Sequence, residues 1–192
     1  SIRLATPYLF ASMGETLGQR SGVLNLGLEG TMLVGALAAF LTVARTGSLG
    51  LGVLAALAAG LAMAMILILA SVVFKGEQGI SGIGLYLFGL GLAGVLNRVT
   101  SGGVRTVDGF PALDLPWIGP VLSGHHLLTY LAFALVPIMT FVLDRTRFGL
   151  QVKAVGQNPQ AADALGISVA RTRALAVSIG GMLGGLAGAS LS

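Results

Sequence analysis

The side chains that could carry out acid–base, nucleophilic or metal chemistry are few in this chain and form no catalytic arrangement. Its 192 residues include no cysteine and only two histidines, His125 and His126, which are adjacent. On a helix such neighbours point about 100° apart, and no other histidine, cysteine or carboxylate stands nearby at metal-ligand spacing. A pair in an interfacial loop is the preferred interpretation. We therefore expect no catalytic residue, no metal site and no cofactor.

The sequence also contains no nucleotide-hydrolysing motif. The pattern GxxxxGK followed by Ser or Thr, whose backbone N–H groups cradle phosphates, is absent from the 192 residues. If the protein works with ATP, hydrolysis must take place on another subunit.

One ionisable residue, Glu29, stands inside an apolar run, in the segment RSGVLNLGLEG. At the centre of a membrane such a group costs about 2.5 to 3.5 kcal/mol. Either Asn25 caps a restarting helix and Glu29 benefits from its dipole, or an interrupted helix exposes backbone along a solute path. Both interpretations stay open, with Asn25 and Glu29 as candidate pathway residues. Tyr86 and Asn97 are further candidates, although such residues more often bond to a neighbouring helix.

The composition indicates that the helices carrying these residues lie in a membrane. Apolar residues make up 55% of the chain and charged residues 9%, whereas soluble domains average roughly 25% charged. The net charge of +4 could suggest nucleic acid, but the basic residues lie between apolar runs rather than on an aromatic face. We expect membrane lipid as a partner and no nucleic acid.

The sequence predicts an all-α fold, a polytopic transmembrane helical bundle. About six apolar segments can be compared with the roughly 20 residues that a spanning helix needs. They are 4–17, 26–44, 49–74, 79–97, 127–143 and 174–192. The first is interrupted by Pro7 and Glu15, and we expect a broken or tilted span there.

A polar island at 144–173 separates the last two apolar segments and holds five of the eleven basic residues. They are Arg145, Arg147, Lys153, Arg171 and Arg173. Such clusters mark the cytoplasmic side. The loop 98–126 is then external, with an interfacial cap made of Pro111, Pro116, Trp117 and Pro120. Counting back along the chain puts Lys75 and the turn at 15–20 inside and Arg45 outside.

A short helix with marked ends is predicted within this island. Asn158 can cap free N–H groups, Pro159 suits the first helical position, and Gly166 can take the left-handed conformation that ends a helix. One face is expected to carry Ala161, Ala162 and Leu165.

Glycine spacing predicts that the last apolar segment is a central, tightly packed helix. Pairs four residues apart let another backbone approach closely. The residues concerned are Gly180, Gly181, Gly184, Gly185 and Gly188. Such spacing alone does not identify a transporter.

The chain is expected to be one transmembrane domain, 1–192, and a fragment that lacks C-terminal spans. It begins at Ser1 without methionine and ends at Ser192 within an apolar run. Pro7 and Glu15 fall where the apolar core of a secretory signal would lie, so no cleaved leader is expected.

Two blocks of sequence resemble a known family. They are IRLATPYLFASMGETLGQRSGVLNLGLEGTMLVGALAAF and GLQVKAVGQNPQAADALGISVARTRALAVSIGGMLGGLAGAS. Both look like the permease subunits of bacterial ABC importers for branched-chain amino acids, simple sugars and nucleosides. The block RSGVLNLGLEG is most similar to the nucleoside type, which pairs with a basic-membrane-protein-like lipoprotein receptor.

The resemblance implies a multi-pass protein of the bacterial plasma (inner) membrane that imports a small polar solute, with a nucleoside as the first expectation. It implies a complex of two permease subunits, identical or homologous, two ABC ATPase subunits and an extracytoplasmic solute-binding protein or lipoprotein. The ATPase-coupling segment maps onto Gln157, Asn158, Pro159, Gln160, Ala161, Ala162, Asp163, Leu165 and Gly166.

Other functions remain as alternatives. A simple-sugar or branched-chain amino acid permease belongs to the same branch. A secondary transporter or channel would usually show inverted repeats or a ring of ionisable residues, and no convincing repeat is seen. A structural membrane protein would explain the glycines but not the capped helix.

Overall fold

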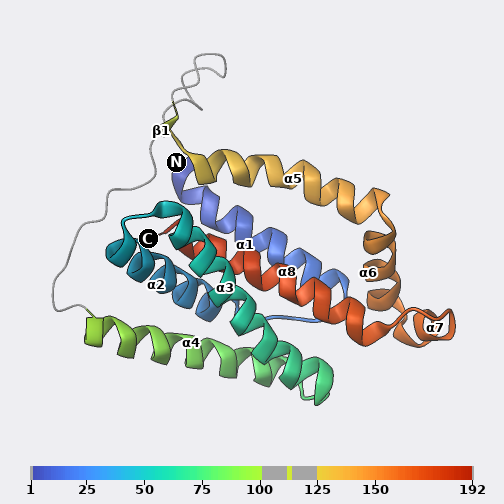
Figure 1. The fold of residues 1–192 in the computed structure, drawn as a ribbon. Helices are drawn as coiled ribbons and strands as arrows, with labels where there is room; N and C mark the ends of the chain where they lie inside the picture. Colours follow the sequence, from blue (N-terminus) through green and yellow to red (C-terminus); the bar gives the residue numbers. More distant parts are fainter. Residues whose placement is uncertain (1, 101–111, 114–124, 192) are drawn as a thin grey trace.

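The computed structural model describes residues 2–100, 112–113 and 125–191, which form a bundle of long helices (Figure 1). The helices are α1 (Ile2–Arg20), α2 (Leu28–Thr46), α3 (Leu49–Leu67) with a π-helical continuation η1 (Ile68–Val73), α4 (Gln78–Thr100), α5 (Leu127–Arg145), α6 (Arg147–Gln157), α7 (Pro159–Ala164) and α8 (Val169–Ala189). Two residue pairs, β1 (Ala112–Leu113) and β2 (His125–His126), pair antiparallel. The expected all-α helical bundle is confirmed.

Four of the described helical segments are long and apolar enough to cross a membrane. They are Leu28–Thr46, Leu49–Val73, Gln78–Leu96 and Leu128–Arg145. The first and last of the six expected segments lie in α1 and α8, which are not among them. α8 begins earlier than expected, so that Arg171 and Arg173 fall in its first turns. Of the two alternatives expected for the first segment, a broken span is wrong, because α1 continues through Pro7; a tilted span stays a prediction.

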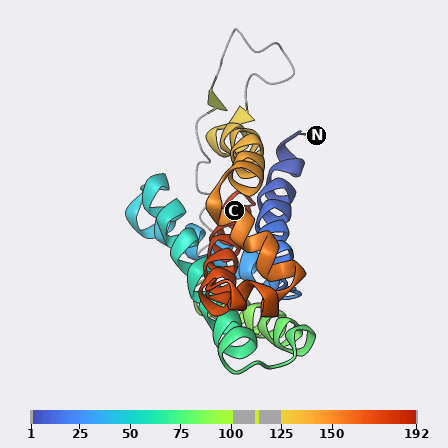
Figure 2. The same ribbon diagram turned by 90° about the vertical axis from the view of Figure 1, so that its right-hand side faces the viewer.

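α8 lies in the middle of the bundle. In the view of Figure 2 it stands between α3 on one side and α1 on the other. Most residues of its second half are buried. A central helix of this kind must approach several neighbouring helices at once, and small residues allow this close approach.

All five glycines singled out in α8 lie against another helix. Gly180 faces Gly14 of α1, Gly181 and Gly185 face α3, and Gly184 and Gly188 face α2. A Cβ at Gly185 or Gly188 would overlap the main-chain oxygen of Ala56 or Met32. The close approach of these helices therefore requires glycine at both positions.

α5 joins the bundle through a cluster of buried side chains. Phe10, Leu128 and Ala132 are buried in one cluster with Leu183 and Leu186 of α8. The hydroxyl of Thr6 donates to Thr129 Oγ1 over 3.0 Å in the same contact, where both residues are buried.

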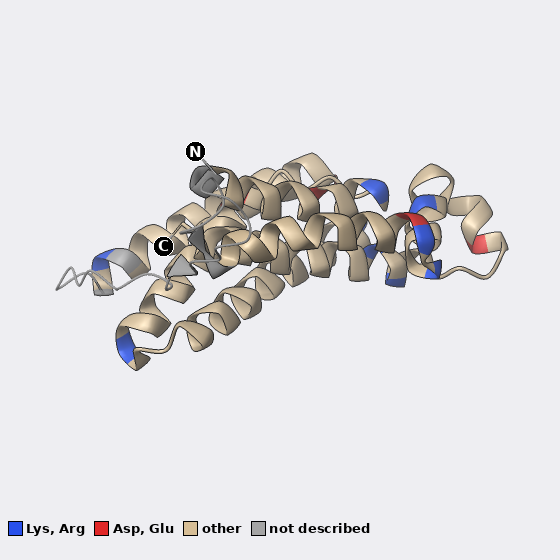
Figure 3. Cartoon of the chain, turned by 90° about the horizontal axis from the view of Figure 1, so that it is seen from above, with Lys and Arg blue, Asp and Glu red and all other residues tan. Residues whose placement is uncertain are grey.

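The Lys and Arg residues gather at the two ends of the bundle (Figure 3). One end, called the basic end below, carries Arg20, Lys75, Arg145, Arg147, Lys153, Arg171 and Arg173, which lie where α1, η1 and α5 finish and where α4, α6 and α8 start. Arg45 and Arg98 lie in the last turns of α2 and α4, at the other end. This grouping agrees with the expected topology; that the basic end is cytoplasmic stays a prediction. Most of the expected external loop, with Pro111, Pro116, Trp117 and Pro120, lies outside the described residues.

Candidate functional site

An interruption of helical structure separates α1 from α2. Residues 21–27 are irregular and run along the start of α4. The N–H of Leu24 donates to Gln78 Oε1 over 3.0 Å, and Gln78 Nε2 donates to the carbonyl of Gly22 over 3.2 Å. α2 therefore begins inside the bundle, where Gly27 lies against Gly82 and Leu85. The restart of a helix just before Glu29, which both interpretations of the sequence assumed, is confirmed; that this segment lies along a solute path stays a prediction.

Asn25 does not cap α2. The capping position is Gly27, without a side-chain bond, whereas Asn25 Oδ1 accepts from the N–H of Gly27 over 3.0 Å. An asparagine that bonds two residues ahead forms a local turn and is no longer free to cap. The N–H of Asn25 donates to Glu15 Oε1 over 3.2 Å. Sequence reasoning missed this role of Glu15, for which spacing gives no signal.

Glu29 and Tyr86, two of the candidate pathway residues, line one cavity. It measures about 400 Å³ and lies between α1, α2, α4 and Leu191, which follows α8. Its walls are Pro7, Tyr8, Glu29, Met32, Leu33, Ala36, Tyr86 and Leu191. Asn25 is not among them, and the side chain of Asn97 lies outside the described residues.

Two glycine contacts bring Glu29 and Tyr86 together. A Cβ added at Gly30 would lie 2.8 Å from Tyr86 Cα. A Cβ added at Gly89 would lie 2.6 Å from the main-chain oxygen of Gly30. α2 and α4 thus touch through their backbones at this level. Glu29 is exposed in the first turn of α2, and Tyr86 is half-buried on α4. The cavity is mostly apolar, with one carboxylate and two tyrosine hydroxyls as its polar side-chain groups.

The short helix α7 has the ends that the sequence predicted. Asn158 Oδ1 accepts from the N–H of Ala161 over 3.0 Å, and Pro159 takes the first helical position. Gly166 has φ +79°; its N–H donates to Asp163 and that of Ile167 to Ala162, over 2.8 and 3.0 Å. This is the paired hydrogen bonding of a Schellman motif. The prediction of a capped helix is confirmed, with Gln157 as the last residue of α6.

The prediction that Ala161, Ala162 and Leu165 share one face is wrong. Ala162 is 2% exposed, whereas Leu165 is 81% exposed and Ala161 is exposed as well. α7 lies across the basic end with its inner side covered, so the boundary between covered and open surface passes between these residues. Leu165 also follows the last helical residue and has ψ 7°. Of these three residues, Ala161 and Leu165 are available for an external contact.

α6 forms the support for α7, which sequence analysis did not separate from its surroundings. Thr146 caps it by accepting from the N–H of Gly149 over 3.2 Å. Val152 is fully buried in a cluster with Leu17, Leu143 and Ala176. Lys153 forms an ion pair with Asp144 at the end of α5. The spacing of Val152 and Val155 and the threonine cap were the available signals.

Within the described residues, no group of three or more His, Cys, Asp or Glu side chains could hold a metal ion. The candidate site consists of a cavity beside a helix interruption, together with a capped helix at the basic end.

Comparison with known proteins gives matches along the whole chain. Residues 1–192 match the family described as "Branched-chain amino acid transport system / permease component". The putative glucose ABC transporter permease protein TsgC13 of Haloferax volcanii is 40% identical over 203 residues, covering 100% of this chain and 61% of that protein. The guanosine ABC transporter permease protein NupQ of Bacillus subtilis is 35% identical, and the nucleoside ABC transporter permease protein NupC of Lactococcus lactis is 33% identical; each match covers 96% of this chain and 63% of the relative. The chain thus spans about three fifths of the length of these relatives. No solved structure matches significantly.

Proposed function

The chain belongs to this family of permease components, and on that premise we propose that it is the translocation subunit of an ATP-binding-cassette importer for nucleosides. It is a multi-pass protein of the plasma (inner) membrane, with several helices able to span a bilayer. Two relatives are named for guanosine or nucleosides and one for glucose. A simple sugar is therefore the second candidate solute.

The observation that carries the proposal is the cavity containing Glu29 and Tyr86. Its volume of about 400 Å³ is in the usual range for a small-molecule site, roughly 300 to 1,000 Å³. A nucleoside presents hydroxyl and amino donors for the Glu29 carboxylate and a flat base for the rings of Tyr8 or Tyr86. Stacking of a base on an aromatic side chain contributes about 1–3 kcal/mol.

The same cavity is less well suited to the solutes of the other permeases in this branch. A hexose supplies hydroxyl donors for Glu29 but no aromatic base for the tyrosines. A branched-chain amino acid carries a carboxylate, and no Lys or Arg is among the cavity's described lining residues. Family membership favours an ABC permease over a secondary transporter, a channel or a purely structural membrane protein.

The partners proposed are a second permease subunit, two ATPase subunits and an extracytoplasmic solute-binding protein or lipoprotein. α7 is the proposed contact with the ATPase, because its ends are fixed by Asn158 and Gly166 and it presents the exposed Leu165. A rigid element of this kind can carry rigid-body motion into the attached spans.

Glu29→Gln in the full-length permease, reconstituted with its ATPase and binding protein, is expected to reduce nucleoside uptake about tenfold or more. The amide loses charge-assisted hydrogen bonds, each of which is worth about 1.5–3 kcal/mol. The measurement is initial uptake of a labelled nucleoside into proteoliposomes, normalised to folded protein.

Glu77→Gln is the matched control for Glu29→Gln. Glu77 accepts hydrogen bonds from the N–H groups of Gly79 and Ile80 at the start of α4 and does not line the cavity. Its replacement is expected to leave uptake near the wild-type value. Normal uptake by Glu29→Gln, with Glu29→Leu lowering only the amount of folded protein, would make Glu29 a structural residue.

The solute class is tested on the binding protein that copurifies with the full-length permease. Nucleosides, pentoses, hexoses and branched-chain amino acids are titrated in turn by calorimetry. Tight nucleoside binding is expected. Hexose binding would favour the sugar alternative, and the absence of any such partner would contradict the importer assignment.

A further inference from the structure

A second cavity lies at the basic end, between the start of α4 and the helix α7. It measures about 640 Å³ and is lined by residues of η1, the η1–α4 turn, α4, α7 and the start of α8. Its walls are more polar than those of the cavity at Glu29. The polar side chains are those of Ser71, Lys75, Gln78, Gln160, Asp163, Ser168 and Arg173. The proposed transport pathway does not use this cavity.

Two cations from different elements line this cavity. Lys75 lies in the turn before α4, and Arg173 lies in α8. The Nε of Arg173 donates to the carbonyl of Ser21 over 3.2 Å, whereas no hydrogen bond involves the side chain of Lys75 among the described residues. In the part of the chain that the structure describes, the one ion pair is Lys153 with Asp144. Among the described residues, neither cavity cation therefore forms an ion pair.

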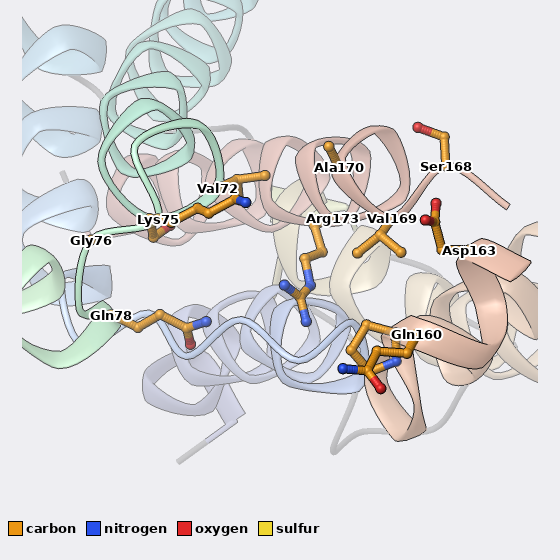
Figure 4. Close-up of a pocket in the computed structure, with 12 residues that line it drawn as sticks. Val72, Lys75, Gly76, Gln78, Gln160, Asp163, Ser168, Val169, Ala170 and Arg173 are labelled. Atoms are coloured by element: carbon orange, nitrogen blue, oxygen red, sulfur yellow. The ribbon is translucent and has the colours of Figure 1, made fainter.

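The hydrogen-bond donors converge from opposite sides (Figure 4). Gln78 extends from one side and Gln160 from the other, with the guanidinium of Arg173 between them. The carboxylate of Asp163 lies at the far edge, beside Val169, and points away from that group. Two cations and two amides against one peripheral carboxylate favour an anion with several acceptor oxygens, such as a phosphate group.

The surface beside this cavity is apolar. Val73 and Phe74, which directly precede Lys75, are 57% and 78% exposed, and Ile80 in the first turn of α4 is 73% exposed. Val73 ends one helical segment that can cross the bilayer, Phe74 directly follows it, and Ile80 lies near the start of the next such segment. A soluble anion would not explain the apolar flank, whereas a phospholipid would cover both parts, its phosphate in the cavity and its chains along η1 and α4.

We propose that this cavity binds the headgroup of an anionic phospholipid, held by Lys75 and Arg173. Basic pockets between membrane helices at the cytoplasmic surface are suited to such headgroups. Pro159 and Gln160 of α7 form one wall and Gly76 and Gln78 the opposite wall, so the bound lipid bridges the helix α7 and the spans. This site is separate from the solute cavity and does not depend on which solute is carried.

The test uses the full-length permease purified with its ATPase subunits in neutral detergent. Native mass spectrometry measures binding of a phosphatidylglycerol and of a phosphatidylcholine with the same acyl chains. Wild-type protein is expected to prefer phosphatidylglycerol. A basic side chain near a membrane surface contributes about 1 kcal/mol to anionic-lipid binding, so Lys75→Gln should reduce that preference about fivefold.

Two further variants, Arg45→Gln and Lys75→Gln combined with Arg173→Gln, show whether the effect is specific to this cavity. Arg45→Gln removes one positive charge at the opposite end, where Arg45 is exposed, and should leave the preference unchanged. Lys75→Gln is the main test variant, because among the described residues the Lys75 side chain makes no hydrogen bond that would be lost. Residue 75 has φ +53°, and glutamine keeps a long side chain there. Adding Arg173→Gln should abolish the remaining preference, although it also removes the bond to Ser21.

Three results would overturn the proposal. The first is equal binding of the two lipids by the wild-type protein. The second is an equal loss in Lys75→Gln and Arg45→Gln, which would reflect net charge alone. The third is displacement of phosphatidylglycerol by equimolar glycerol phosphate, which would identify a free anion as the occupant. Because binding is measured without transport, none of these results bears on the nucleoside assignment.

Discussion

Replacing Leu165 with aspartate is expected to abolish solute uptake by the assembled transporter while the protein stays folded in the membrane. Leu165 is 81% exposed at the end of α7, so the isolated permease loses little packing. Burial of a leucine against an ATPase would contribute about 1.5–3 kcal/mol, and a charge left unpaired in that contact would add a further penalty. Uptake and solute-stimulated ATP hydrolysis should both fall at least tenfold.

The controls for this substitution separate coupling from folding. Leu150→Asp places the same charge on α6, where Leu150 is 70% exposed, and is expected to retain most uptake. Ala162→Asp should instead lower the amount of folded protein, because Ala162 is buried. Unchanged uptake in Leu165→Asp would contradict the coupling role proposed for α7.

Gly185→Ala is expected to prevent normal assembly of the bundle. The added methyl group would overlap the main-chain oxygen of Ala56 and lie 3.2 Å from Gly60 Cα. Neither neighbour has a flexible side chain that could move aside, so α3 and α8 must separate. Overpacking typically costs about 1–3 kcal/mol and occasionally more. The measurement is the monodisperse fraction in fluorescence-detected size exclusion, followed by thermal unfolding of what remains.

Gly91→Ala in α4 is the matched control for Gly185→Ala. No atom lies within 4 Å of the position that its Cβ would take. Since alanine favours a helix over glycine by up to about 1 kcal/mol, the variant should be as stable as the wild type or slightly more so. A Gly185→Ala protein that assembles and unfolds like Gly91→Ala would show that the α3–α8 contact tolerates adjustment.

Features set by near neighbours in the sequence were predictable. The caps of α7 depend on Asn158, Pro159 and Gly166, each of which acts within a few residues of its own position. The helix interruption before Glu29 was visible for the same reason. The glycine spacing predicted the tight packing of α8, but it did not indicate which helices α8 packs against.

Features that depend on which elements meet could not be read from the chain. The meeting of Glu29 and Tyr86 requires the contact of Gly30 with Gly89, two helices apart in the sequence. The opposite exposures of Ala162 and Leu165 depend on what covers a single turn of helix. The Asn25 side chain could either cap α2 or bond to the N–H of Gly27, and local sequence does not distinguish the two. The bond to Gly27 forms, which excludes the cap.

The backbone contacts of α8 also affect how the bundle can move. Where Gly14 meets Gly180 and Gly60 meets Gly181, main-chain atoms touch directly, so there are no rotamers to exchange and little room to slide. α1, α2, α3 and α8 should therefore turn as one body during a transport cycle. α5 contacts α1 through Phe10 and Leu128, whose side chains can repack between states. The hinge of the cycle is expected at that side-chain interface rather than along the glycines.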